Sequence, residues 1–146
     1  MRSKALFVLA CLALGVVTPG LAQSPADSAA IRQVALDYVE AWYEGDTTRM
    51  GRALHPALVK RIIYTDSLGD TFLSQEDARQ LITAAGAGRG RDDVQRRADV
   101  AILDVFENAA SVRVDGGDWI DHLQLVRFRE RWYILHILGA FRSGAP

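Results

Sequence analysis

The chain has 146 residues, of which 49% are hydrophobic and 24% are charged, and its formal net charge is −1. A chain of this length with this apolar content is expected to form one domain with its own hydrophobic core. The near-neutral charge argues against a nucleic-acid-binding protein, which normally carries a concentrated positive face.

The N-terminal residues have the order of a secretory signal peptide. Two basic residues precede an apolar stretch over 5–17, and Gly20-Leu21-Ala22 supplies the small residues that a signal peptidase recognises. The stretch is shorter than the roughly 20 residues of a membrane-spanning helix. We therefore predict a signal peptide over residues 1–22, a periplasmic or secreted protein, and no stable membrane insertion. An uncleaved anchor and a lipid on Cys11 are the less favoured alternatives.

The first helix is predicted to run from the Ser24-Pro25-Ala26-Asp27 segment to Gly45. This segment is a partial capping box with proline at the first helical position, and Gly45 suits a left-handed C-terminal cap. Trp42 is expected to be more buried than Tyr43, because Trp42 continues the apolar stripe and Tyr43 lies one position round the helix. The stripe consists of Ile31, Val34, Ala35, Tyr38, Ala41 and Trp42.

Two shorter helices are predicted farther along the chain. The second is capped by Asp46 and stopped by Pro56, and the third begins at Ser74 and ends at Gly86. The glycine- and arginine-rich loop over 86–91 follows a helix and precedes a strand, so it fails the test for a dinucleotide-binding loop. We predict a mobile connector there.

Strand patterns fill the remainder of the chain. A β-branched run over 59–64 and a shorter one over 71–73 lie between the second and third helices. The short turns between the four later runs allow only antiparallel hairpins, and such long strands twist into a curved sheet. The predicted fold class is α+β, with a cone-shaped curved antiparallel sheet wrapped around N-terminal helices and a pocket at its mouth. The four later runs are Ala98–Phe106, Ala109–Asp115, Trp119–Phe128 and Trp132–Phe141.

Six segments carry a family resemblance. They are Tyr38-Val39-Glu40-Ala41-Trp42-Tyr43-Glu44-Gly45-Asp46, Arg52-Ala53-Leu54-His55-Pro56, Asp104-Val105, Asn108-Ala109-Ala110-Ser111-Val112, Trp119-Ile120-Asp121 and Arg131-Trp132-Tyr133-Ile134. Together they resemble the nuclear transport factor 2-like superfamily and, within it, the small bacterial proteins of the family named Putative lumazine-binding. The resemblance implies a cystatin-like cone over residues 24–142, without implying a particular ligand. The chain departs from the family pattern at His122-Leu123-Gln124 and at His136.

We predict that the pocket binds a small, partly aromatic organic molecule. Strand alternation places His122 and Gln124 on one face of their strand, and it places His136 on the same face as Ile134 in the last strand. If the helix stripe faces these surfaces, the pocket is lined by Tyr38, Trp42, His122, Gln124 and His136. No cofactor is predicted, and no metal site either, because the three histidines lack ligand spacing.

Three functions remain open from the sequence. The leading hypothesis is an exported small-molecule-binding protein. The first alternative is an enzyme of the cyclase, isomerase or hydrolase type that uses His122 or His136 with Asp121 or Asp104; no catalytic residue is assigned. The resemblance disfavours an isomerase, because basic residues occupy the strand position where isomerases of this superfamily carry their carboxylate base. The second alternative is a non-catalytic dimeric interaction module. We also predict a homodimer through the outer face of the terminal strands, because Trp119, Leu123 and Leu125 share one face of their strand.

Overall fold

The computed structural model of the chain describes residues 24–93 and 95–142. The predicted signal peptide lies outside the described residues. In chain order the elements are α1 (Pro25–Glu44), α2 (Thr47–Ala53), β1 (Leu54–Thr65), β2 (Thr71–Asp77), α3 (Ala78–Gly86), the short 3-10 helix η1 (Arg89–Asp92), β3 (Arg96–Phe106), β4 (Ala109–Gly117), β5 (Trp119–Phe128) and β6 (Arg131–Phe141).

Local capping signals set the ends of α1 and α2. The Asp27 N–H donates to the Ser24 hydroxyl at 3.0 Å, and Gly45 adopts a left-handed conformation with φ of 73° at the other end of α1. The Asp46 carboxylate accepts from the Arg49 N–H and begins α2. These three caps confirm the predicted helix starts and the end of α1. The predicted stop of the second helix at Pro56 was wrong: α2 ends at Ala53, because Leu54 begins β1 and pairs with Ile134 of β6.

The start of the third helix was predicted too early. β2 continues past Ser74 to Asp77, because its residues pair with β1 along the whole register from Thr65–Thr71 to Val59–Asp77. Asp77 then caps α3 in a full capping box with Gln80. Pairing with a neighbouring strand thus overrode the local helix signal at Ser74.

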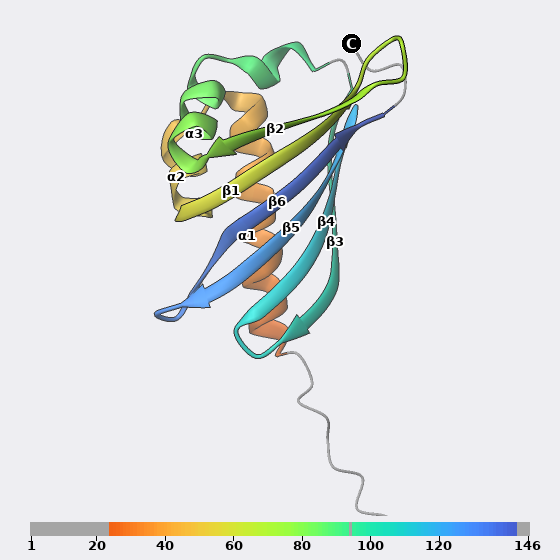
Figure 1. Cartoon of the computed structure of the whole chain (residues 1–146). Coiled ribbons are helices and arrows are strands. Elements are labelled where there is room, and N and C mark those ends of the chain that lie inside the picture. The colour runs from red at the N-terminus through yellow and green to blue at the C-terminus, as the bar shows by residue number, and fades with distance from the viewer. Residues whose placement is uncertain (1–23, 94, 143–146) are drawn as a thin grey trace, which may run out of the picture.

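The six strands form one curved sheet in the order β2-β1-β6-β5-β4-β3. Every neighbouring pair is antiparallel except β1 and β6, which are parallel. The sheet curls around α1 without closing, while α2 and α3 gather beside β1 and β2 (Figure 1). The predicted α+β cone is confirmed, with one parallel pair that the sequence did not predict.

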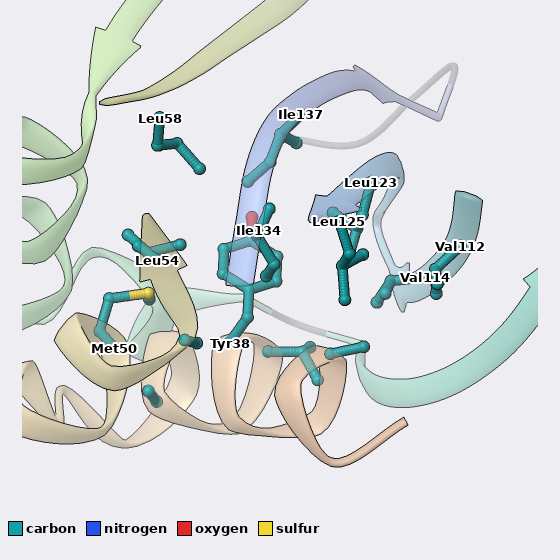
Figure 2. Packing of buried hydrophobic residues seen from close by; sticks show 14 of the residues in the cluster. Tyr38, Met50, Leu54, Leu58, Val112, Val114, Leu123, Leu125, Ile134 and Ile137 are labelled. Carbon is teal, nitrogen blue, oxygen red and sulfur yellow. The ribbon is translucent and has the colours of Figure 1, made fainter. Parts of the chain in front are cut away.

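The core lies between α1 and the concave face of the sheet. In Figure 2 the Tyr38 side chain rises from α1 with its hydroxyl directed at the sheet, beside Ile134 of β6 and Leu125 of β5. Met50 and Leu54 close the same core from α2 and the start of β1. Burial of these side chains removes apolar surface from water and is the main favourable term in folding.

The predicted orientation of β5 was wrong, although its alternation was right. Trp119, Asp121, Leu123 and Leu125 face the core, and His122 and Gln124 are exposed on the outer face. The larger apolar side chains of one face fill the core, so the face that carries the polar residues remains in water.

A β-bulge in β6 accounts for the placement of His136. Leu125 pairs with Ile134 but Gln124 pairs with His136, so Leu135 is an extra residue between two regular stretches. An extra residue shifts the following side chains to the opposite face. Ile134 therefore points into the core, and His136 and Leu138 point outward, whereas unbroken alternation predicted one face for all three.

The relative burial of Trp42 and Tyr43 is also opposite to the prediction. Tyr43 is 8% exposed and belongs to the core, while Trp42 is half-buried against it. The single proton of the Tyr43 hydroxyl is shared between the carbonyl oxygens of Gly116 at 2.7 Å and Arg97 at 2.9 Å. Because the curled sheet covers more of the circumference of α1 than one stripe, the position beside the stripe is enclosed as well.

Candidate functional site

A cavity of about 310 Å3 lies between α1 and the concave face of the sheet. Its buried end is formed by Tyr38 of α1, Lys60 of β1 and Asp121 of β5, which are 1%, 8% and 2% exposed. Trp42 and Trp119 line it between this end and the surface. A buried lysine and aspartate at the end of a cavity are the most unusual feature of the described residues, since charged side chains are rarely buried without a partner.

Tyr38, Lys60 and Asp121 are joined by hydrogen bonds, and we refer to them as the Lys60 cluster. The Tyr38 hydroxyl donates to Asp121 Oδ2 at 2.5 Å. Lys60 Nζ donates to Tyr38 Oη at 2.8 Å and to Asp121 Oδ2 at 3.1 Å. The ammonium and the carboxylate thus form an ion pair, bridged by the tyrosine, that offsets the cost of removing both charges from water.

Strand register brings these three side chains together. Lys60 shares the inward face of β1 with Leu58 and Ile62, and Asp121 shares the inward face of β5 with apolar neighbours. Gly139 of β6 pairs with Asp121, and a Cβ atom at Gly139 would lie 2.3 Å from Asp121 Oδ1. Only glycine therefore leaves room for the carboxylate at this point of the sheet.

Aromatic rings surround the ammonium group. Lys60 Nζ lies 5.5 Å from the ring centroid of Tyr38, 6.0 Å from that of Trp42 and 5.7 Å from that of Trp119. Cations within about 6 Å of an aromatic face are attracted by the ring quadrupole. The rings therefore stabilise the charge of Lys60 in a place where water is largely excluded.

Asp93 holds the two indole rings in place. Its Oδ2 accepts hydrogen bonds from Trp42 Nε1 at 3.1 Å and from Trp119 Nε1 at 3.2 Å. One carboxylate oxygen thereby links α1 to β5 across the cavity wall. The walls of the cavity are consequently oriented before any ligand binds, which lowers the conformational cost of binding.

The segment that was predicted to be a mobile connector packs against this wall. It contains η1, and Gly90 is buried so closely that a Cβ atom would lie 2.3 Å from the carbonyl oxygen of Trp42 and 2.5 Å from its ring. The glycine therefore permits close backbone approach. The sequence showed the glycines but not the tryptophan that they would meet.

Gly90→Ala is expected to lower the free energy of unfolding by about 1–3 kcal/mol, the usual cost of overpacking, because η1 must move away from Trp42. The indole environment should change with it, so urea unfolding followed by tryptophan fluorescence measures both effects. Gly51→Ala is the control without a clash: neither Gly90 nor Gly51 has a positive φ, and the atom nearest to an added Cβ at Gly51 lies at 3.7 Å, an ordinary van der Waals contact. Equal stability losses in the two variants would contradict the packing of η1 on Trp42.

Stability at high pH is expected to depend on two buried tyrosines. Burial, and next the negative charge of Asp121, raise the pKa of Tyr38 well above its ordinary value of 10.0, and burial raises the pKa of Tyr43 to about 12. The unfolded chain ionises these groups first, so the stability they contribute is fully present below pH 10 and falls as the pH rises toward the folded-state values. Between about pH 8 and about pH 11, the urea midpoint should fall further in the wild type than in Tyr38→Phe. A pH dependence unchanged in that variant would contradict the assignment.

Of the five predicted pocket residues, the structure places Tyr38 and Trp42 in the cavity. His122, Gln124 and His136 lie together on the outer face, where His136 Nδ1 and Gln124 Oε1 are 3.2 Å apart. These three line a shallow hollow of about 430 Å3, separated from the cavity by the sheet. The five residues therefore do not form one site.

Among the described residues, no hydrogen bond or ion pair joins a histidine to an aspartate of the acid–base pairs considered for an enzyme, although His136 and Asp104 line one hollow on the outer face. His122 and Asp121 are consecutive residues of β5 and point to opposite faces of the sheet. Asp104 is exposed on β3. Sequence reasoning considered Asp121 only as a partner for histidine, and it used the basic residues of the run over 59–64, which include Lys60, only as an argument against an isomerase. The missed signal was a charged residue at an inward position between apolar residues in each strand.

Residues 24–93 and 95–142 contain no helix that is long and apolar enough to cross a bilayer. Within the same ranges, no three histidine, cysteine, aspartate or glutamate side chains converge as metal ligands would.

Comparison with known proteins bears on the family and the fold. Residues 26–137 match the model of the family described as Putative lumazine-binding. An NTF2-like protein of unknown function from Shewanella baltica OS155 is 20% identical, with a TM-score of 0.60 over 78% of this chain and 92% of that one. A protein of unknown function with a cystatin-like fold from Nostoc punctiforme PCC 73102 is 10% identical, with a TM-score of 0.62 over 84% of this chain and 96% of that one.

A third structure is an NTF2-like protein with a cystatin-like fold from Novosphingobium aromaticivorans, which is 12% identical, with a TM-score of 0.60 over 82% of this chain and 84% of that one. No protein of curated function matches the chain in sequence. At these identities the structural likeness establishes the fold and no more.

Proposed function

This chain belongs to the family described as Putative lumazine-binding, and on that premise we propose that it binds a small, partly aromatic organic molecule in the cavity at the Lys60 cluster. The observation that carries the proposal is the buried ion pair of Lys60 and Asp121 at the end of an aromatic cavity. Replacing a buried ion pair by apolar residues is often neutral or stabilising, so packing alone does not account for it.

The dimensions and chemistry of the cavity fit this role. Its volume of about 310 Å3 lies at the lower end of the range of roughly 300–1,000 Å3 found for small-molecule sites. Such sites combine apolar walls with a few fixed polar groups that orient the ligand. Here the indoles of Trp42 and Trp119 are the walls, and the Lys60 cluster and Asp93 are the polar groups.

Native mass spectrometry of the protein from its own host tests the proposal, because a carried ligand appears as added mass. Ile62→Trp should fill the cavity that Ile62 lines and abolish the added mass. Leu103→Trp is the matched control, since Leu103 is 56% exposed on β3 and does not line the cavity. Absence of added mass in the wild type, or equal added mass in Ile62→Trp, would contradict the proposal.

The binding protein is proposed to act in the periplasm or outside the cell. The support is the sequence order of basic residues, apolar stretch and Gly20-Leu21-Ala22. Intact mass of the native protein tests it, and a mature chain that begins near Gln23 is the expected result. Retention of residues 1–22 would overturn this location.

We also propose a homodimer through the outer face of the sheet, but with other residues than those that the sequence indicated. Trp119, Leu123 and Leu125 face the core and cannot contribute. Phe106 and Leu138 are exposed, at 69% and 48%, and both line hollows shared with Gln124 and His136 on the outer face. Contiguous exposed apolar surface of this kind commonly marks an interface.

Sedimentation at tens of micromolar is expected to show a dimer for the wild type and a monomer for Leu138→Glu, because a charge at the centre of an apolar interface is left without a partner. Leu68→Glu serves as the control, since Leu68 is exposed in the β1–β2 turn, away from that face. A monomeric wild type would reject the dimer.

A further inference from the structure

We infer that the ligand presents a neutral carbonyl oxygen, carried on a flat ring, to the remaining N–H of Lys60. This inference rests on the proposed function, because it names the chemistry that the same cavity selects. It follows from three properties of the lining: the count of hydrogen-bond donors, the balance of charges and the orientation of the rings.

The donor count leaves one N–H of Lys60 for a ligand. An ammonium group has three donors, and two of them are used by Tyr38 Oη and Asp121 Oδ2. Among the described residues no other side chain or carbonyl accepts from Lys60 Nζ, although the side chain lines the cavity and is 10% exposed. The hydroxyl proton of Tyr38 is already donated to Asp121. Lys60 is therefore the group of the cluster that can donate to a ligand, and the ligand atom must be an acceptor.

The charge balance favours a neutral acceptor over a carboxylate. Lys60 is paired with Asp121, and Arg89 is paired with Glu76 at 3.7 Å near the exposed end. Asp93 adds a negative charge, compensated by two indole N–H groups rather than by a cation. An anionic ligand would meet this charge in a partly dehydrated cavity, where repulsion is stronger than in water. A carbonyl oxygen accepts the Lys60 N–H without that penalty.

The ring geometry favours a flat molecule. Asp93 fixes both indoles through one oxygen atom, so Trp42 and Trp119 do not need to be ordered by the ligand. At the exposed end Tyr64 and Phe141 stack on each other with ring centroids 5.4 Å apart. Planar rings are the shapes that stack best against such surfaces.

Three probes of one shape separate the features of this inference. They are 2-quinolone, which carries a neutral carbonyl, naphthalene, which carries no hydrogen-bond acceptor, and quinoline-2-carboxylate, which is anionic. Affinities at neutral pH are measured by titration calorimetry and by quenching of tryptophan fluorescence. A hydrogen bond to a charged donor is expected to make 2-quinolone bind roughly ten- to a hundredfold tighter than naphthalene. The carboxylate should bind more weakly than 2-quinolone.

The triple variant Tyr38→Phe, Lys60→Met and Asp121→Leu removes every hydrogen-bond donor of the Lys60 cluster together with the paired charge, so neither charge is left buried alone. Circular dichroism checks its fold. In this variant the advantage of 2-quinolone over naphthalene should disappear, while His122→Ala, a change on the outer face, should preserve it.

The outcomes distinguish this inference from the proposed function. Equal binding of the three probes, tighter binding of the carboxylate, or an advantage of 2-quinolone that survives in the triple variant would overturn the inference. If Ile62→Trp abolished binding in any of these cases, the cavity would still be a binding site. If no probe bound, or if Ile62→Trp left probe binding unchanged, both the inference and the proposed function would be contradicted.

Discussion

Asp121→Ala is expected to lower the free energy of unfolding by about 3–5 kcal/mol, which is the usual cost of breaking one side of a buried ion pair. The ammonium of Lys60 would remain buried with Tyr38 as its only hydrogen-bond acceptor among the described residues. Urea unfolding at neutral pH, followed by circular dichroism, measures the loss. The carboxylate is 2% exposed and its partner side chain 10% exposed, so solvent screening reduces the effect very little.

Two further variants make this expectation specific. Asp104→Ala removes an exposed carboxylate and should change stability by less than about 0.5 kcal/mol. Lys60→Met combined with Asp121→Leu replaces both charges by apolar groups and should recover most of the loss. If the double variant lost as much free energy of unfolding as the two single variants together, the two charges would not be coupled.

The same experiment connects stability with function. If the apolar double variant is as stable as the wild type, the ion pair is not required for folding. Its presence in the cavity would then be explained by what the cavity binds, which is the argument of the proposed function. A stable double variant that no longer carries the native ligand is the expected combination.

The sequence predicted the elements of this fold well because their signals are local or periodic. The caps at Ser24, Gly45 and Asp46 depend on neighbouring residues alone, and the four later strands are separated by short turns. The prediction failed where pairing with a segment distant in the sequence determines the local structure. Pairing with β1 carries β2 past Ser74, and the parallel pairing of β1 with β6 joins residues far apart in the chain.

The candidate site was only half predictable for the same reason. Tyr38 and Trp42 lie on a helix whose buried stripe can be read from periodicity. The direction of His136 could not be predicted, because one extra residue at Leu135 turns it to the opposite face of β6. Lys60 and Asp121 lie on different strands, and no sequence spacing brings a lysine and an aspartate 61 residues apart into contact.

Tyr43→Ala is expected to lower the free energy of unfolding by roughly 3–5 kcal/mol, the usual cost of losing a core aromatic. Trp42→Ala is expected to lower it by less. Tyr43 is packed in the core, 6.4 Å between ring centroids from Trp119, and its hydroxyl donates to two carbonyl oxygens. Trp42 is half-buried and borders the cavity, so its removal exposes less of the core and leaves a space that water can enter.

Urea midpoints of the two variants decide between these expectations, and Tyr43→Phe separates packing from hydrogen bonding. The phenylalanine keeps the ring but leaves the carbonyl oxygens of Arg97 and Gly116 without this donor, which should cost about 1–3 kcal/mol. Tyr64→Ala is the control for loss of an exposed aromatic, since Tyr64 lies at the open end of the cavity. A lower midpoint for Trp42→Ala than for Tyr43→Ala would mean that the apolar stripe on α1, rather than the enclosure of the helix by the curled sheet, determines which side chains hold the core together.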